Sequence, residues 1–401
     1  MTARKVLGVM CCVLGIACAP NTQHATPFIS HATEERGTPL AAAAAFLDSA
    51  IAQGAAPGAE IGVSSHGRRW YYGAGRLGRD DAHRPDSLTL YDLASMTKVI
   101  GLTTLVMQAV TEGKLDLDAP IQRYVPAFQG PHKDSVTLRH LLTHSAGLPA
   151  WRPLFLQAAT RTEAFALADT TPLDTLPGVR MVYSDLGIIV MTQAIEGVYG
   201  HRIDTLFAER VAAPLGLAST RYLPPPTWLA RIAPTEQDPW RGRMIRGEVH
   251  DENASRLDGV SGHAGLFSDA EDLLTFGEWL LRATAPAELR IPGKGDVAPA
   301  IGAGILHEFV RRQDLVPGSS RALGWDTPSG PSSSAGHLLS PESVGHTGFT
   351  GTSIWIDPTR DLVVVVLSNR VHPTRANNKW GELGVRGGVA DGVVAALESG
   401  H

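Results

Sequence analysis

The sequence predicts an α+β domain with an antiparallel sheet formed from both chain ends and a helical region inserted between them. Strand patterns lie at residues 59–65 and 70–74 near the start, and at residues 353–356 and 362–367 near the end. Residues 119–223 carry mostly helical patterns of apolar residues. Strands at both ends with helices between them favour one sheet built from the two ends, which is an α+β arrangement.

The individual elements follow from local patterns. An Ala-rich segment at residues 40–53 predicts a helix, and residues 66–69 join the first two strands as a hairpin. Apolar residues recur at helical spacing from Val99 to Ala109, so a helix is predicted over residues 96–112. Further helices are predicted at residues 138–143, 162–168, 187–198, 204–213 and 388–398. Gly, Pro and Ser residues gather at residues 316–341, which predicts a long loop before the last strands.

The N-terminal segment has the pattern of an export signal. Arg4 and Lys5 precede an apolar run at residues 6–16 that is too short to cross a bilayer as a helix. We therefore predict a signal peptide at residues 1–17, a polar tether at residues 18–39 and a folded domain at residues 40–398. No other run of eighteen apolar residues is present in the sequence.

The cysteines restrict the chemistry. All three, Cys11, Cys12 and Cys18, lie in the N-terminal segment, so the predicted domain has no thiol nucleophile, disulfide or cysteine-based metal site. Residues 14–17 before Cys18 resemble a bacterial lipoprotein processing box, although Gly15 stands where a larger apolar residue is usual. Lipidation of Cys18 and ordinary cleavage nearby both remain open, and the former would anchor the protein in the periplasm or cell envelope.

The charge argues against a nucleic-acid partner. Loss of the two cations Arg4 and Lys5 with the signal takes the formal charge from −5 to −7. We expect a small-molecule or peptide substrate, with membrane contact only through a lipid on Cys18.

Ser95 and Lys98 form the central motif. They stand three residues apart at the start of a predicted helix, so both side chains lie on one face, and unpaired backbone N–H groups favour negative charge at Ser95. This is the spacing of an activated serine that forms an acyl-enzyme. The alternative is an N-capping serine followed by a solvated lysine.

Three further segments bear on that choice. Tyr183-Ser184-Asp185 precedes a helix, and a phenol near a lysine can relay a proton. Residues 345–351 contain three glycines and open a strand hairpin whose N–H groups can face an oxyanion. In isolation, a structural interpretation of each segment is favoured: a half-buried tyrosine near a helix start for the first, and a glycine-rich turn for the second. A second glycine-rich segment at residues 262–268 is expected to be structural.

Taken together and in order, these motifs resemble one family. Residues 91–98, 113–120, 141–148, 183–185 and 346–348 are similar to the ordered motifs of the serine β-lactamase and penicillin-binding protein superfamily. Within it, the chain resembles the branch of class C β-lactamases, D,D-carboxypeptidases, D-aminopeptidases and esterases. The resemblance covers residues 40–398 and implies a β-lactamase/transpeptidase-like fold with the active site between the sheet and the inserted helices, and no cofactor or metal.

The resemblance also implies roles for individual residues. Ser95 would be the acylated nucleophile, and Lys98 and Tyr183 would share the general-base and proton-shuttle work. The N–H groups of Ser95 and Phe349 would form the oxyanion hole. The remaining matched positions would bind substrate; they are Asp185, His346, Thr347 and Gly348.

Two positions depart from the family pattern. Asp185 replaces the usual asparagine, can only accept hydrogen bonds, and favours a protonated Lys98. His346 stands where β-lactamases usually have lysine, so the site is expected to be up to two charges less positive. One charge pair at about 4 Å contributes roughly 1 kcal/mol in water and roughly 4 kcal/mol near a protein surface. We therefore expect weaker carboxylate capture than in a typical β-lactamase.

This charge argument orders the expected functions. We expect an exported ester or amide hydrolase of the esterase or peptidase type first, and a penicillin-binding D,D-carboxypeptidase or a class C-like β-lactamase next. A protein that is acylated without turnover, as a penicillin-binding sensor or scaffold, is the non-enzyme alternative.

Competing sites in residues 140–147 are weaker. Ser145 follows a helical pattern and lacks the strand that precedes a nucleophile elbow. His140 and His144 stand four apart as zinc ligands do, but Leu141 occupies the place of the catalytic glutamate, which favours a structural pair.

Overall fold

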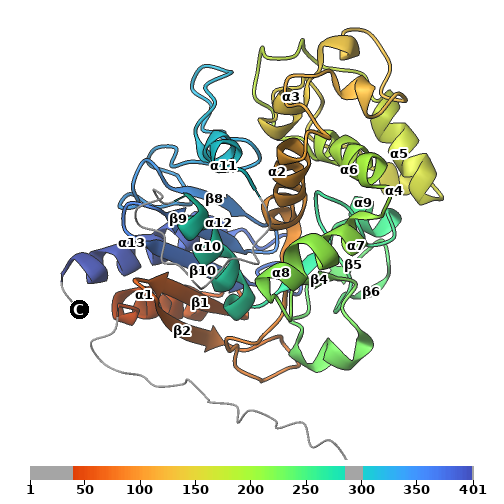
Figure 1. Ribbon diagram of the computed structural model, residues 1–401. Coiled ribbons are helices and arrows are strands. Elements are labelled where there is room, and N and C mark those ends of the chain that lie inside the picture. The colour runs from red at the N-terminus through yellow and green to blue at the C-terminus, as the bar shows by residue number, and fades with distance from the viewer. Residues whose placement is uncertain (1–38, 285–300, 400–401) are drawn as a thin grey trace, which may run out of the picture. The chain divides into compact units, whose positions relative to one another are not determined.

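The main sheet of the protein joins the two ends of the domain, as predicted. The computed structural model describes residues 39–284 and 301–399. Its five-stranded antiparallel sheet has the order β2-β1-β10-β9-β8. The strands are β1 (Gly58–Ser65), β2 (Arg68–Gly75), β8 (Val344–Thr347), β9 (Ser353–Asp357) and β10 (Leu362–Ser368). Figure 1 shows the early strands β1 and β2 beside the late strands, and the α+β class is confirmed.

The predicted N-terminal features lie outside this part of the chain. The signal peptide at residues 1–17, Cys18 and nearly all of the tether precede residue 39. None of the helices in the described ranges combines the length and apolar composition needed to cross a bilayer.

Helices cover both faces of the sheet. Alternate residues of β10 belong to two separate apolar cores, because successive side chains of a strand point to opposite faces. Helices α1 (Ala41–Ala52) and α13 (Val385–Glu398) pack together on one face. Helix α10 (Ala270–Thr284) packs on the other, where Gly277 lies against Val363. Burial on both faces explains the continuous apolar sequence of β10.

The inserted region is helical, as predicted, and its apolar core is continuous with the one between α10 and the sheet. Its α-helices in the described residues are α2 (Thr104–Thr111), α3 (Leu138–Leu142), α4 (Leu154–Gln157), α5 (Arg161–Thr170), α6 (Asp185–Tyr199), α7 (Ile203–Phe207), α8 (Ala213–Leu215) and α9 (Glu252–Arg256). Two further helices follow near the C-terminal strands, α11 (Ala303–Val310) and α12 (Lys379–Glu382). No helix or strand lies between α11 and β8, which agrees with the predicted loop.

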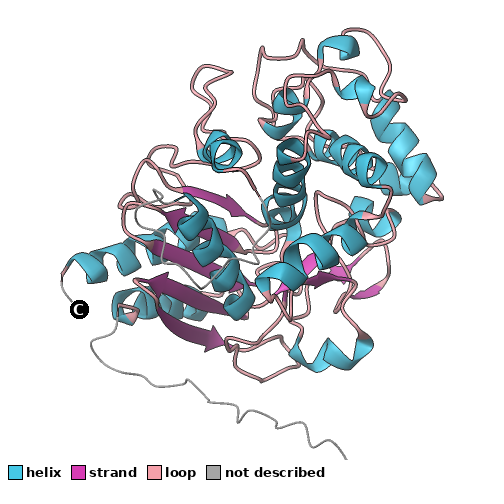
Figure 2. Cartoon of the chain, in the orientation of Figure 1, coloured by secondary structure: helices cyan, strands magenta, loops and turns pink. Residues whose placement is uncertain are grey.

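The insertion also contains short strands that the sequence did not indicate (Figure 2). One small sheet has the order β3-β7-β4, and β5 pairs with β6. These strands are β3 (Tyr91–Asp92), β4 (Arg221–Tyr222), β5 (Gln237–Asp238), β6 (Arg243–Met244) and β7 (Leu266–Ser268). Two or three residues are too few to show alternation, so the pattern could not reveal them.

The helix predicted over residues 96–112 is not uniformly α-helical. A 3₁₀ turn spans Ala94–Met96, a π-helix spans Lys98–Thr103, and only then does α2 begin. A π segment adds a residue to the turn and is frequent at functional sites, although a second one, at Ala208–Ala212, lies outside the motifs of this site. The buried apolar positions keep a near-helical spacing, so the sequence could not distinguish these forms.

Candidate active site

A strained turn presents Ser95. The buried Asp92 carboxylate accepts hydrogen bonds from the N–H groups of Ala94 (2.8 Å) and His250 (2.6 Å). Ala94 has φ of 46°, a left-handed conformation that is uncommon for a residue with a Cβ atom. Such strain persists only where the surroundings fix it, and it is concentrated at functional sites. Asp92 thus holds the backbone that leads into Ser95.

Lys98 is buried and has three acceptors around its Nζ atom. These are Ser95 Oγ at 2.9 Å, the His263 carbonyl oxygen at 3.0 Å and Asp185 Oδ1 at 2.7 Å. Three acceptors match the three N–H donors of an ammonium group. Burial alone would lower the pKa of Lys98, but the Asp185 carboxylate, followed by Tyr183, outweighs it and the pKa is raised. Lys98 therefore rests protonated, which agrees with the effect expected from Asp185.

Ser184 places Asp185 at the start of α6. Its hydroxyl caps the helix by accepting from the Gly187 N–H and donates to the Pro149 carbonyl at 2.7 Å. The Asp185 N–H donates to the Ala150 carbonyl at 3.0 Å. Asp185 lies in the first helical turn, where the helix dipole favours a carboxylate.

Tyr183 lies at the centre of a ring of basic side chains. Its ring centroid is 5.1 Å from Lys98 Nζ and 5.2 Å from the guanidinium carbon of Arg321. The rings of His144 and His346 are 4.4 Å and 6.0 Å from it, centroid to centroid. The Tyr183 hydroxyl is buried and lacks a well-aligned hydrogen bond within the described residues. The structure therefore places the Tyr183 ring beside Lys98, as predicted. No well-aligned hydrogen bond from the described residues holds the Tyr183 hydroxyl.

His144 belongs to the site, although the sequence favoured a structural pair with His140. Its Nδ1 accepts from the Ser184 N–H at 3.1 Å, and burial, followed by the charge of Arg321, holds its pKa well below the usual range. His140 instead accepts from the Thr137 N–H in a capping box, so the two histidines have separate roles. Ser145 is buried and shares a hydrogen bond with Thr143.

The turn after β8 is fastened to the backbone before Ser95. Thr350 Oγ1 donates to the Asp92 carbonyl at 2.7 Å, and Thr352 Oγ1 donates to the Leu93 carbonyl at 3.1 Å. A Cβ atom on Gly348 would lie 2.3 Å from the Leu93 oxygen, so glycine allows this close approach. The Phe349 N–H makes no hydrogen bond within the described residues. The two N–H groups predicted for the oxyanion hole, those of Ser95 and Phe349, are therefore on adjoining segments.

Two arginines bind the outer side of this turn. Arg386 Nη2 donates to the Gly348 carbonyl at 2.6 Å, and Arg370 Nε donates to the Phe349 carbonyl at 2.8 Å. Arg386 is partly buried, and burial, followed by the charge of Arg370, lowers its pKa to about 10. The sequence analysis did not assign either arginine, because neither belongs to a motif.

His346 is buried and neutral. Its Nδ1–H donates to the Thr347 carbonyl at 2.8 Å, so Nε2 is the unprotonated nitrogen. Burial, followed by the charges of Arg321 and Lys98, holds the pKa of His346 well below the usual range. Thr347 ends β8 opposite Ser353 and is partly exposed. The lowered pKa agrees with the neutral histidine expected at position 346.

The expected loss of positive charge was counted from the motif positions alone and omits one cation that the fold brings to the site. Arg321, from the long loop, lies over Tyr183 and acts on both His144 and His346. The prediction counted only the motif positions, and Arg321 lies twenty-five residues before His346 in a segment without a pattern. Its guanidinium lies 3.7 Å from Asp326 Oδ2, so this carboxylate balances part of the added charge.

The glycine-rich segment at residues 262–268 both stabilises its own loop and contacts the site. His263 Nδ1 hydrogen bonds with Ser261 Oγ at 2.7 Å, and its Nε2 lies 3.0 Å from Asp251 Oδ1. These contacts agree with the structural role that was expected. The His263 carbonyl, however, accepts from Lys98, which the sequence did not indicate.

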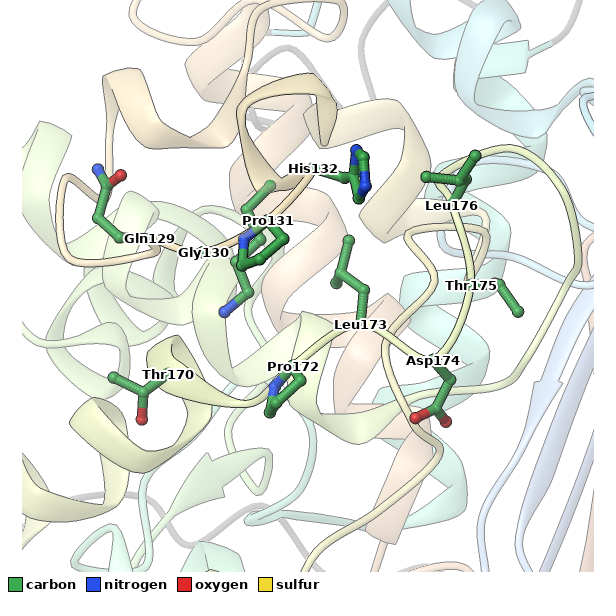
Figure 3. Close-up of a pocket in the computed structure, with 11 residues that line it drawn as sticks. Gln129, Gly130, Pro131, His132, Thr170, Pro172, Leu173, Asp174, Thr175 and Leu176 are labelled. Carbon is green, nitrogen blue, oxygen red and sulfur yellow. The ribbon is translucent and has the colours of Figure 1, made fainter.

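A separate cavity of about 380 Å³ lies in the inserted region (Figure 3). Its lining comes from residues 129–133 and 170–176 and includes none of Ser95, Lys98, Tyr183 or His346. The buried Lys133 ammonium there donates to the Asp169 carbonyl and lies 4.2 Å from the Phe128 ring centroid. This cavity is distinct from the Ser95 centre.

Comparison with known proteins identifies the family. A model of the Beta-lactamase family matches residues 43–385, which include all of the site residues described above except Arg386. The chain belongs to the Beta-lactamase family. The resemblance inferred from the motifs is therefore confirmed, and the protein is a serine hydrolase of this family.

Relatives in the Beta-lactamase family cover several named activities. A putative D-alanyl-D-alanine carboxypeptidase of Salmonella typhi is 31% identical over 331 residues, which is 74% of this chain and 73% of that protein. The solved structure of a β-lactamase from Sulfitobacter sp. EE-36 matches with a TM-score of 0.70 at 22% identity, covering 90% of this chain and 98% of that one. EstCE1, a hydrolase with promiscuous acyltransferase activity, matches with a TM-score of 0.67 at 22% identity, covering 88% and 98% of the two chains. The two structures establish the shared fold.

Proposed function

We propose that this protein hydrolyses an ester or amide through an acyl-enzyme on Ser95. The observation that carries the proposal is the 2.9 Å contact between Lys98 Nζ and Ser95 Oγ, with Asp185 behind the lysine at 2.7 Å. A nucleophilic serine needs a neighbouring base that a third group orients, and these contacts supply both partners. The hydrogen bonds that fasten the turn containing Phe349 to the backbone before Ser95 support a role of the Phe349 N–H in the oxyanion hole.

The acylation step requires Lys98 to lose its proton before it accepts another. Lys98 passes one proton to Asp185, and the neutral amine then accepts the Ser95 hydroxyl proton as Oγ bonds to the substrate carbonyl carbon. The N–H groups of Ser95 and Phe349 stabilise the resulting oxyanion. Tyr183 donates its phenol proton to the departing alcohol or amine and regains a proton from Lys98. The serine proton thereby reaches the leaving group.

Deacylation repeats these transfers with water. A water molecule attacks the acyl carbon, its proton passes through Tyr183 and Lys98, and Ser95 Oγ leaves as a hydroxyl. The product is a carboxylic acid, and the site returns to its resting protonation state. Release of the acyl group distinguishes an enzyme from a protein that is acylated without turnover.

The test follows acylation and turnover on the same protein. Intact mass spectrometry after addition of a p-nitrophenyl ester or a labelled penicillin should detect a transient adduct on Ser95, together with released product. Ser95→Ala should abolish both. Ser145→Ala should retain both, because the Ser145 hydroxyl is buried and hydrogen-bonded to Thr143. Full labelling and hydrolysis in Ser95→Ala would overturn the proposal, and a persistent adduct without product would indicate a binder.

The substrate classes that we propose to compare are D-amino-acid peptides, carboxylic esters and β-lactams. The named carboxypeptidase relative supports the first class, and the shared fold of EstCE1 accommodates the second. A side-by-side turnover assay should use a D-Ala-D-Ala peptide, a short nitrophenyl ester and a chromogenic cephalosporin.

We also propose that the protein is exported and held in the cell envelope by a lipid on Cys18. The support is the charged start, the short apolar run and the cysteine at the predicted cut. Cys18→Ser should move the protein from the membrane fraction to the soluble fraction. Cys12→Ser is the matched control, and equal partitioning of both variants would argue for ordinary cleavage.

A further inference from the structure

We propose that His250 is a positioning residue for the oxyanion hole. Its backbone N–H holds the turn before Ser95, and its ring supports the side chain of Phe349. One residue thus contacts both segments that supply an oxyanion donor. This inference rests on the proposed acyl-Ser95 function and adds to it a residue that lies in none of the matched motifs.

The backbone of His250 is bound to the strained turn that presents Ser95. The Asp92 carboxylate accepts from the His250 N–H at 2.6 Å and from the Ala94 N–H at 2.8 Å. It therefore ties the segment before α9 to Ala94, the residue in the left-handed conformation. Because this contact uses the backbone of His250, it can persist when the side chain is changed.

The imidazole of His250 is stacked against the Phe349 ring. The ring centroids are 5.8 Å apart, and the ring planes differ by 24°. The guanidinium carbon of Arg370 lies 4.5 Å from the centroid of the same Phe349 ring. Phe349 is 48% exposed, so it needs such contacts to keep one orientation. The rotamer of a side chain depends on its backbone dihedral angles, and a fixed ring therefore restricts the peptide unit of Phe349.

A buried ion pair keeps the imidazole of His250 in place. His250 is buried, and its Nε2 lies 2.9 Å from Glu236 Oε2. Arg375 donates to the same carboxylate through its backbone N–H at 2.7 Å and through Nε at 2.6 Å. Burial would raise the pKa of Glu236, but the hydrogen bonds from His250 and Arg375 outweigh it and lower the pKa to about 2. An ionised Glu236 can only accept, so Nε2 of His250 carries a proton and donates it.

The spacing of the two oxyanion donors depends on contacts of this kind. Donors in an oxyanion hole must lie about 2.7–3.1 Å from the charged oxygen, and a displacement of about 1 Å can reduce the rate about 100-fold. Thr350 and Thr352 join the two segments through the carbonyl groups before Ser95. His250 joins the same segments in a second way, through the ring of Phe349. We expect this second link to set the position of the Phe349 N–H.

The test measures how strongly the reaction depends on the oxyanion hole. It compares kcat/KM for a nitrophenyl ester with kcat/KM for the thionoester of the same acid, in which sulfur replaces the carbonyl oxygen. Sulfur accepts hydrogen bonds weakly, so the thionoester gains little from the two N–H groups, and wild-type enzyme should prefer the ester at least about tenfold. The ratio of the two values does not depend on how much of a preparation is folded.

Two substitutions separate the ring of His250 from its hydrogen bond. His250→Ala should lower the ratio of ester to thionoester at least about tenfold, with the loss in kcat for the ester and little change in its KM. His250→Phe should restore most of the ratio, because a phenyl ring can stack on Phe349. In that variant, Glu236 keeps both hydrogen bonds from Arg375.

The matched control is His337→Ala. It removes an exposed imidazole that also pairs with a carboxylate, that of Asp391, and the ratio should not change. Phe349→Ala tests the stacking contact from its other side and changes a half-exposed residue, so it decides alone should both His250 variants fail to fold. It should lower the ratio by a similar factor, and adding His250→Ala to it should cause no further loss. An unchanged ratio in either alanine variant, or full additivity of the two, would overturn the inference.

These outcomes are distinguishable from failure of the proposed function. If the wild-type protein does not hydrolyse the ester through Ser95, the proposed function is wrong and this inference falls with it. If Ser95 is acylated and released, but the wild-type ratio is near one or the variants leave it unchanged, only the role of His250 is wrong.

Discussion

Replacing Asp185 by asparagine should move the pH dependence of the enzyme. The Asp185 carboxylate lies 2.7 Å from Lys98 Nζ, and Coulomb attraction at an effective dielectric of 20 then contributes about 6 kcal/mol in favour of the ammonium. Burial lowers the pKa of Lys98, and the attraction to Asp185, together with Tyr183 and the hydrogen bonds to both groups, outweighs it. Without the carboxylate, the pKa of Lys98 must fall, so the neutral amine forms at lower pH.

In a plot of kcat/KM against pH, the limb that rises with pH should shift to lower pH in Asp185→Asn. A neutral nitrophenyl ester should be used, so that binding of a substrate carboxylate does not contribute. The surface variant Asp118→Asn removes the same charge from an exposed ion pair and should leave the limb in place. A limb that does not move in Asp185→Asn would refute the account of Lys98 as the base controlled by Asp185.

The same substitution should affect stability with a definite sign. A raised lysine pKa stabilises the fold below the unfolded pKa, and this contribution is lost as pH rises through the folded pKa. Breaking a buried pair on one side costs about 3–5 kcal/mol when the remaining charge stays buried. Asp185→Asn should therefore unfold more readily near neutral pH, and the difference from wild type should shrink at high pH. A thermal unfolding series over pH would measure this.

Three other substitutions test the supports of the site. Arg386→Met should lower kcat on the ester about tenfold with little change in KM. Arg386 donates to the Gly348 carbonyl and so polarises the peptide unit that carries the Phe349 N–H. A change in KM alone would contradict this. Gly348→Ala should reduce kcat/KM at least about 100-fold, because the added Cβ would lie 2.3 Å from the Leu93 oxygen and displace the turn that carries the Phe349 N–H. Steady-state kinetics with the ester would measure this. Ser184→Ala should reduce the free energy of unfolding in urea by about 1 kcal/mol through loss of the α6 cap, whereas Ser399→Ala should not.

The sequence could predict the sheet and the helices that have strong local patterns. The two apolar faces of β10 and the cap at Ser184 are encoded within a few residues, and the pairing of the chain ends followed from them. The 3₁₀ and π segments around Ser95 could not be predicted, because they arise from tertiary contacts with Asp92 and the turn after β8.

The site was predictable where chemistry follows a fixed spacing and not where it depends on packing. Ser95 and Lys98 lie on one stretch of chain, so their contact was foreseeable. Arg321 and Arg386 reach the site through the long loop and the last helix, and no spacing relates them to Ser95. The expectation about the charge of the pocket left out Arg321 for this reason, because a count of motif residues omits charges that the fold brings in.

The fastening of residues 350 and 352 to the backbone before Ser95 has a consequence for when the enzyme becomes active. These hydrogen bonds join segments separated by more than 250 residues, so the pocket for the oxyanion forms only after the C-terminal strands have docked. A chain still being synthesised, or one threaded unfolded through a membrane, carries Ser95 and Lys98 but cannot stabilise a tetrahedral intermediate. Catalytic competence would thus arise late in folding, and burst amplitude during refolding would report the docking of β8.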